Sequence, residues 1–146
     1  MNKFGKVIDI NISEKKGVVK HPIPQGEFKE NYGLVGDAHA GKWHRQVSLL
    51  GQESIDKMKV SGVEGLVSGV FAENITTEGI ILYELPVGTK IRVGDTIQEV
   101  TQIGKECHNG CEIRKLVGDC VMPREGIFTR IIEGGVIKAG DVIEIL

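Results

Sequence analysis

A short pattern that occurs twice restricts the fold of this chain more than any other feature. Residues 91–97 read IRVGDTI and residues 137–143 read IKAGDVI. Each copy places a Gly-Asp pair between two short segments rich in branched apolar residues, which is typical of a tight turn between strands. We therefore expect the Gly94-Asp95 and Gly140-Asp141 turns each to join antiparallel strands. Two copies are too few to establish a repeat architecture, because Gly-Asp pairs are common in turns.

The rest of the chain also favours short strands. Its 146 residues include 20 glycines and 4 prolines, and the glycine share is roughly twice the usual one, as many tight turns would require. Alternating apolar residues predict strands over 3–12 and 46–50, with a short return strand over 17–20. From Val70 onward strand-like segments return, including 80–86 and two strands within 89–103. Residues 21–33 contain two prolines and little periodicity, so we expect a surface loop there.

Residues 52–60 predict a short helix. Glu53 lies in the first turn, while Lys57 and Lys59 lie in the last, which matches the helix dipole. Ile55 and Met58 would form the buried face. Many strands with one or two short helices predict a mainly β domain over residues 1–146, and a closed barrel is favoured because closure removes exposed strand edges.

Composition limits the classes of function. The formal charge is −2 and the isoelectric point is about 6.1, which gives no reason to expect nucleic acid or an anionic membrane surface as a partner. No apolar run approaches the roughly 20 residues of a membrane span. The N-terminus lacks the apolar core of a signal peptide, so we expect a cytoplasmic protein whose thiols are reduced.

All three cysteines of the chain, Cys107, Cys111 and Cys120, lie within residues 104–130. Asn109 is a good helix cap, so Cys111 is expected in the first turn of a short helix, where backbone N–H groups favour the thiolate. The thiolate is both the nucleophile and the metal ligand, which makes Cys111 the best candidate of the three. The same segment supplies cations that would support it: His108, Arg114, Lys115, Arg124 and Arg130.

Other interpretations of these cysteines remain open at this point. A free cysteine is often a small buried apolar residue. Cys107 and Cys111 are separated by three residues, so they form a single pair, whereas a structural zinc site usually needs about four ligands. His39 and His44, with Asp37 nearby, are the residues that would complete such a site. The spacing does not fit a thioredoxin-like redox pair, and nothing in the sequence orders a hydrolytic triad.

A second cluster of cations occupies the glycine-punctuated segment 36–45. It contains His39, Lys42, His44 and Arg45. Such a loop presents backbone N–H groups together with cationic side chains, so it predicts a cradle for a phosphate or another anion. The plainer alternative is a solvated loop with Trp43 packed over it as a lid. We expect this loop to line the same cleft as Cys111, although more than 60 residues separate them.

Three segments together resemble the MOSC domain family, which is named for the C-terminal domain of molybdenum cofactor sulfurases. They are GDAHAGKWHRQVSLL at 36–50, AENITTEG at 72–79 and CVMPREGIFTRIIEGGVIKAGDVIEI at 120–145. The resemblance implies a β-barrel of the type found in pyruvate kinase. It also implies a functional cysteine near the C-terminus, the second of a closely spaced pair, which here is Cys111. The pair is one residue further apart than in many relatives, and Cys120 belongs to the version of the pattern found in small members.

The resemblance further implies a choice between two functions. In one, the domain binds the anionic molybdenum-pterin cofactor, with Cys111 as metal ligand and with cationic residues around the cofactor. In the other, it carries sulfur as a cysteine persulfide, received from a separate cysteine desulfurase that depends on pyridoxal phosphate and passed to the cofactor or a molybdoenzyme. Cys107 and Cys120 share the candidate catalytic role with Cys111. A non-catalytic small-molecule or zinc-binding module is the alternative from another class. The cationic residues assigned to the cofactor are His39, Lys42, His44, Arg45, Arg114, Arg124 and Arg130.

Overall fold

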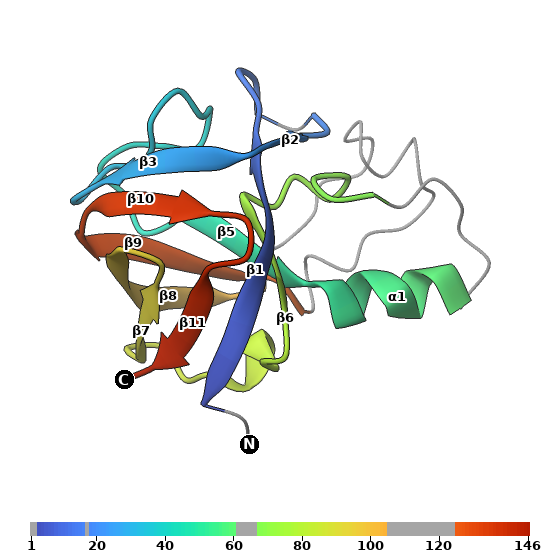
Figure 1. The fold of residues 1–146 in the computed structure, drawn as a ribbon. Helices are drawn as coiled ribbons and strands as arrows, with labels where there is room; N and C mark the ends of the chain where they lie inside the picture. The colour runs from blue at the N-terminus through green and yellow to red at the C-terminus, as the bar shows by residue number, and fades with distance from the viewer. Residues whose placement is uncertain (1–2, 17, 61–66, 105–124) are drawn as a thin grey trace.

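The structure of the protein is a computed structural model that describes residues 3–16, 18–60, 67–104 and 125–146. Figure 1 shows a strand-rich molecule with a short helix at one side. The elements in chain order are β1 (Phe4–Ile12), β2 (His21–Ile23), β3 (Gln25–Lys29), β4 (Gly33–Leu34), β5 (Val47–Gly51), α1 (Gln52–Val60), β6 (Ile75–Glu78), the 3-10 helix η1 (Leu82–Glu84), β7 (Lys90–Val93), β8 (Thr96–Ile103), β9 (Ile127–Glu133), β10 (Gly135–Lys138) and β11 (Val142–Ile145).

Seven strands form a closed barrel. Their order is β11-β7-β8-β9-β5-β6-β1, and β1 pairs back onto β11 through Phe4 with Glu144 and Lys6 with Val142. The β5–β6 pair is parallel, and the other pairs of the barrel are antiparallel. Strand β2 extends the sheet beyond β1. The predicted mainly β barrel is therefore confirmed.

A second sheet packs against the barrel, in the order β10-β3-β4. It pairs segments far apart in the chain, since Phe28 lies opposite Gly135 and Gln25 lies opposite Lys138. The surface loop expected over residues 21–33 is therefore wrong, because β2, β3 and the start of β4 lie there. Strand β2 pairs with β1 and β4 pairs with β3, whereas β3 also pairs with β10, about a hundred residues away, which no local pattern indicates. The return strand expected over 17–20 begins instead at His21.

The two Gly-Asp turns have different outcomes. Gly94-Asp95 joins the antiparallel pair β7–β8, as expected. Gly140-Asp141 joins β10 to β11, but these strands belong to different sheets and do not pair with each other. The second expectation is wrong because β11 pairs with β1 and β7 to close the barrel. The turns lie together: the Gly94 N–H donates to the Val142 carbonyl at 3.2 Å and the Asp95 N–H to the Val136 carbonyl at 3.2 Å.

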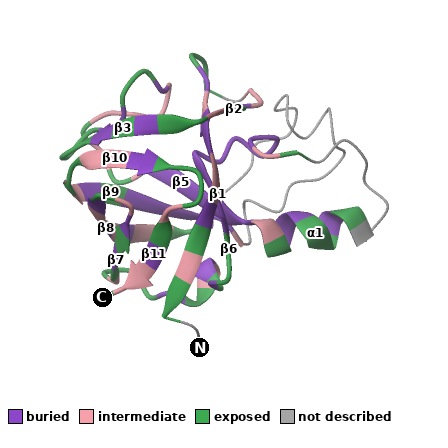
Figure 2. Cartoon of the chain, viewed as in Figure 1, coloured by how far each residue is buried: buried purple, intermediate pink, exposed green. Residues whose placement is uncertain are grey.

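Helix α1 spans the predicted residues 52–60. Figure 2 shows buried and exposed positions in alternation along it. Ile55 and Met58 are buried, as predicted. These two pack with Leu50, Phe71 and Phe128 in a small core beside the barrel. The main core fills the barrel and includes residues of the second sheet. The strand expected over 80–86 is wrong, because these residues contain η1, which places Leu82 and Leu85 in the main core.

Within the ranges that the structure describes, no helix is long and apolar enough to cross a membrane.

Candidate functional site

The glycine loop of residues 36–45 is held in place by a buried carboxylate. Asp37 Oδ1 accepts from the Ser13 backbone N–H at 3.1 Å and from Lys20 Nζ at 2.7 Å. Asp37 Oδ2 accepts from the His39 backbone N–H at 3.0 Å. The loop is thereby tied to the turn that follows β1, and the Ala38 N–H strengthens this connection by donating to the Ser13 carbonyl at 2.9 Å.

The Lys20–Asp37 ion pair is unusual because both side chains are fully buried. Lys20 Nζ also donates to Ser13 Oγ at 2.9 Å. Burial alone would raise the pKa of Asp37, but the hydrogen bond and charge of Lys20 and the two backbone donors together lower it. Asp37 is therefore ionised at neutral pH.

His39 and Trp43 make contacts within the loop, close to Asp37. Trp43 Nε1 donates to the His39 carbonyl at 2.7 Å, and His39 Nδ1 lies 3.8 Å from Asp37 Oδ2. The His39 side chain is only 15% exposed. The Gly41 N–H donates to the Tyr32 carbonyl at 2.7 Å. The loop is thus ordered by its own contacts, and the interpretation of Trp43 as a packed lid is consistent with them.

Two cations stack on Trp43. Lys16 Nζ lies 4.8 Å from the ring centroid, and the Arg45 guanidinium carbon lies 4.7 Å from it. The Arg45 guanidinium carbon also lies 5.7 Å from the Phe128 ring centroid. Arg45 Nε is buried and has no hydrogen-bond partner among the described residues. Cation–π contacts stabilise a guanidinium without neutralising it, so Arg45 keeps its charge and donors for an anion.

The 36–45 loop contacts the end of β8, which directly precedes residues 105–124 in the sequence. These residues contain the three cysteines and are called the cysteine segment below. His44 Nε2 and Gln102 Oε1 are 2.9 Å apart, and Thr101 Oγ1 donates to the His44 carbonyl. Gln102 lies near the end of β8, where the Gly104 N–H donates to the Gly126 carbonyl at 2.6 Å. These two glycines lie on either side of residues 105–124 in the sequence, so the loop contacts β8 close to the last described residue before that segment, Gly104.

Several predicted site residues lie outside the described residues, and their roles stay predictions. They are Cys107, Cys111, Cys120, Arg114 and Arg124, together with the expected helix that starts near Asn109. Arg130 lies on β9, where its Nε donates to Glu99 Oε1 at 2.6 Å. Lys42 is exposed in the loop. The structure therefore brings His39, His44 and Arg45 together at one loop and places Arg130 in a surface ion pair.

The segment 72–79, which carries part of the family resemblance, contains a network of buried hydrogen bonds. Glu73 accepts from the Gly69 N–H at 3.1 Å, the Phe71 N–H at 3.2 Å and Thr76 Oγ1 at 2.8 Å. Burial raises the pKa of the Glu73 carboxyl, although these three donors act in the opposite direction. Asn74 Oδ1 accepts from the Ser48 backbone N–H at 3.0 Å. These contacts join β6 to the neighbouring strands, so this segment supports the barrel.

Metal binding by the described residues has no structural basis. No group of three or more His, Cys, Asp or Glu side chains in these ranges is arranged to hold a metal ion. His39 and His44, suggested as zinc ligands, are directed into contacts with different neighbours, Asp37 and Gln102. The zinc alternative depends on the cysteines, and it stays a prediction.

Sequence reasoning missed the buried base of the loop. Lys20 and Ser13 precede the loop by many residues and carry no recognised motif. The only local signal was a lysine directly after the apolar residues Val18 and Val19. Glu125 was also missed; its carboxylate lies immediately after the cysteine segment and bonds to Ser54 and Lys57 on α1.

Together these features define a class of protein: a small β-barrel domain in which a hydrogen-bonded cationic loop contacts the end of β8. Comparison with known families makes the assignment specific. The MOSC domain matches residues 36–144, so the chain belongs to the MOSC domain family.

Solved structures share this fold. The crystal structure of YuaD from Bacillus subtilis has a TM-score of 0.82 and 18% identity, covering 97% of this chain and 95% of that one. YiiM from Geobacillus stearothermophilus has a TM-score of 0.76 and 17% identity, with 97% and 75% covered. YiiM from Escherichia coli has a TM-score of 0.71 and 19% identity, with 99% and 70% covered. At these identities the likeness concerns the fold alone. A comparison with curated protein sequences gives no significant match.

Proposed function

We propose that this MOSC domain works in molybdenum cofactor chemistry, with Cys111 as its functional thiolate and the 36–45 loop as its anion-binding element. MOSC domains are associated with this cofactor, which is anionic through its phosphate. The observation that carries the proposal is Arg45: a guanidinium with a buried, unpartnered Nε, in a loop that contacts the end of β8, which directly precedes the cysteine segment in the sequence.

The charges of the loop support an anionic ligand. Within the described ranges, Lys16, Lys42 and Arg45 have no carboxylate partner, whereas Lys20 and Arg130 are already paired. Unpaired cations favour phosphate binding. The N–H groups of residues 37–41 and of Trp43 donate to other protein oxygens, so the cationic side chains would make the contacts. His39, Lys42, His44 and Arg45 would therefore hold the cofactor's phosphate. Arg114 and Arg124 remain candidates from the cysteine segment, and Arg130 is a weaker one because Glu99 neutralises it.

Cys111, in the cysteine segment, would contact the cofactor. When bound, the molybdenum-pterin cofactor supplies a redox-active metal that accepts a thiolate ligand. The contribution of this chain is to keep the sulfur deprotonated, and Asn109 as a helix cap with Arg114 and Lys115 one turn on would do this. Cys107 and Cys120 are the alternative sulfurs.

The second candidate function is sulfur transfer. The Cys111 thiolate would attack the outer sulfur of a donor's cysteine persulfide; the donor S–S bond breaks, the new S–S bond forms at Cys111, and the donor leaves as its thiolate. The proposed donor is a cysteine desulfurase, and the acceptor is the cofactor or a molybdoenzyme. The concentration of all three cysteines of the chain in one segment supports this function. A zinc-binding or otherwise non-catalytic module is the third candidate.

Mass spectrometry and metal analysis of protein purified without oxygen distinguish the three. Molybdenum with pterin fluorescence supports cofactor binding, a mass increase of one sulfur atom at Cys111 without molybdenum supports sulfur transfer, and stoichiometric zinc or inert thiols contradict both. Cys111→Ser should abolish the signal, with Cys107→Ser and Cys120→Ser as matched variants. Loss of signal only in one of the latter variants would assign the function to that sulfur.

The role of the loop has its own test. Arg45→Met keeps the packing against Trp43 and Phe128 but removes the charge, so cofactor retention should fall by about tenfold or more, as expected for a charge-assisted contact. Arg92→Met is the control, because Arg92 is paired with Glu144 on the exposed face of β7. Equal retention in both variants would contradict the anion-binding role of the loop.

A further inference from the structure

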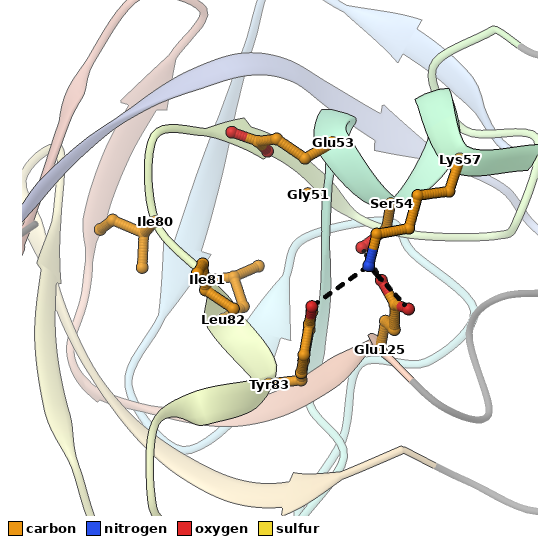
Figure 3. Close-up of a pocket in the computed structure, with 9 residues that line it drawn as sticks. All are labelled: Gly51, Glu53, Ser54, Lys57, Ile80, Ile81, Leu82, Tyr83 and Glu125. Carbon is orange, nitrogen blue, oxygen red and sulfur yellow. Dashed lines mark hydrogen bonds and ion pairs between the residues drawn. The ribbon is translucent and has the colours of Figure 1, made fainter. Parts of the chain in front are cut away.

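A separate pocket lies between α1 and η1. Its volume is about 230 Å³, and Figure 3 shows Lys57 extending from α1 toward Tyr83 and Glu125 at one side of it. Ligand pockets for drug-sized molecules are typically 300–1,000 Å³, so this one suits a compound built on a single ring. The lining residues are Gly51, Glu53, Ser54, Lys57, Ile80, Ile81, Leu82, Tyr83 and Glu125.

The wall of the pocket is mostly apolar. Ile80, Ile81 and Leu82 form one continuous stretch of it, and Gly51 adds backbone without a side chain. Ile80 and Leu82 are fixed in the main core, while Ile81 is 48% exposed at the mouth. An apolar wall with a few polar groups at one side is the usual composition of a small-molecule site.

The polar side of the pocket disfavours anions. Glu125 Oε1 accepts from Ser54 Oγ at 2.6 Å and from Lys57 Nζ at 3.1 Å, so the lysine charge is offset by a carboxylate. Glu53 adds a second carboxylate, whose Oε2 accepts from the Gly79 N–H at 2.7 Å. One lysine against two glutamates gives the lining a formal charge of −1. A neutral ligand is therefore preferred over an anionic one.

Tyr83 provides the donor for such a ligand. Its hydroxyl oxygen accepts from Lys57 Nζ at 3.2 Å, and its ring lies 5.3 Å from the same ammonium. The hydroxyl hydrogen has no acceptor within the part of the chain that the structure describes. Because the lysine orients the hydroxyl oxygen, the hydrogen is available to an acceptor atom in the pocket.

We propose that this pocket binds a neutral, mainly apolar small molecule whose hydrogen-bond acceptor contacts the Tyr83 hydroxyl. The proposal does not depend on the cofactor, since the pocket and the 36–45 loop use different residues and prefer ligands of different charge. Failure of cofactor binding would leave it intact, and its own failure would leave the proposed function intact.

The probes are benzamide, which is neutral and carries a carbonyl acceptor, and benzoate, which has nearly the same shape and a negative charge. In a titration followed by ¹H–¹⁵N NMR, benzamide should bind in the millimolar range, as a fragment of this size does. It should shift the backbone amide signals of Ser54, Leu82 and Tyr83. Benzoate should bind about tenfold more weakly or not at all. Equal binding of both, or shifts confined to other regions, would overturn the proposal.

Variants test whether benzamide binds through the Tyr83 hydroxyl and beside Ile81. Tyr83→Phe removes the donor and keeps the ring, so the affinity for benzamide should fall about three- to tenfold. Tyr32→Phe is the matched control, because Tyr32 is exposed and lies outside the pocket lining. Ile81→Trp should fill the mouth and abolish binding while the circular dichroism spectrum is unchanged. Unchanged affinity in Tyr83→Phe would contradict the assigned donor, and unchanged affinity in Ile81→Trp would contradict the assigned pocket.

Discussion

The ion pair of Lys20 and Asp37 decides the position of the glycine loop. Removing two charges from water costs several kcal/mol per ion, which is recovered only when both are fully hydrogen-bonded. Lys20 has Ser13 Oγ and Asp37 as acceptors, and Asp37 has two backbone donors as well as the lysine. The pair is therefore satisfied as a unit, and the loss of one member leaves the other charged and buried.

Lys20→Met tests this dependence. The substitution leaves Asp37 without its ion partner, and the free energy of unfolding should fall by about 3–5 kcal/mol. Arg92→Met is the control, since the Arg92–Glu144 pair is exposed and such pairs contribute about 0–1 kcal/mol. Urea denaturation of both variants gives the comparison. A loss below about 1 kcal/mol in Lys20→Met would show that the buried pair does not hold the loop.

Glu73 gives the stability a pH dependence of its own. Burial raises the pKa of its carboxyl above the ordinary value of 4.5, so the folded state binds the proton more tightly than the unfolded state. The stability linked to Glu73 is fully present below that value and is lost as the pH rises through the folded pKa. Glu73→Gln cannot titrate, so the stability of the wild type relative to this variant should decrease from about pH 4.5 upward and then level off.

Urea denaturation of the wild type and Glu73→Gln across this pH range measures the effect, because the other titrating groups cancel in the difference. Glu27→Gln on the exposed face of β3 is the matched control variant. A constant difference between wild type and Glu73→Gln at all pH values would show that the carboxyl titrates normally in the fold.

Among the elements, local patterns were sufficient where the stabilising contacts are local. The helix over 52–60 was predicted with its correct bounds because its charges and its buried Ile55 and Met58 follow the helical period. The β7–β8 hairpin was predicted because its turn and both strands are contiguous. Strand β3 was not predicted, and neither was the change of sheet after Gly140-Asp141. Each depends on a partner strand that is distant in the sequence.

The connection before β6 depends on a glycine that permits close approach of two segments. Gly69 has a φ of +87°, and a Cβ there would lie 2.3 Å from the Lys20 carbonyl oxygen. Its own carbonyl accepts from the Lys20 N–H at 2.9 Å. Neither atom of this contact belongs to a flexible side chain, so a larger residue at position 69 must displace backbone.

Gly69→Ala should therefore destabilise the protein much more than Gly88→Ala. Gly88 has a φ of +96° with no atom within 4 Å of an added Cβ, so its substitution carries only the cost of the left-handed backbone, about 1 kcal/mol. Gly69→Ala adds the overlap with the Lys20 carbonyl, and the loss should exceed that of the control by at least about 1–3 kcal/mol. Thermal unfolding compares the two; equal losses would contradict the close packing of the Lys20 backbone on Gly69.

For the whole molecule, the sequence predicted the barrel and one cationic loop but not what fixes that loop. Many short strands indicate a closed sheet, and the cluster from His39 to Arg45 is contiguous in the sequence. Both features could therefore be predicted from the sequence. The partners of this cluster are not contiguous: Asp37 depends on Lys20, Arg45 on Phe128, and His44 on Gln102. Contacts of this kind arise only when the barrel brings strand ends together, which no local pattern encodes.

Closure of the barrel also predicts which sheet of the molecule unfolds locally. Each of the seven barrel strands has a paired neighbour on both sides, whereas the sheet β10-β3-β4 has an edge at β10 and another at β4. Phe28, Leu34 and Ile137 of that sheet share the main core with barrel residues, so apolar contacts hold it in place, but its two edge strands each have a strand partner on one side only. We expect the small sheet to open without opening the barrel.

Native-state hydrogen exchange with increasing denaturant tests this expectation. The hydrogen-bonded amides of β1, β7 and β11 should exchange only through global unfolding, with opening free energies equal to the stability measured by denaturation. Those between β3 and β10 should exchange with opening free energies about 1–3 kcal/mol lower and with a weaker dependence on denaturant, because their opening exposes less surface. Strand β11 makes the comparison sharp, since it follows β10 after a single turn yet belongs to the closed barrel. If the amides of β10 and β11 exchange with the same free energy, the two sheets unfold as one unit and closure of the barrel gives its strands no separate stability.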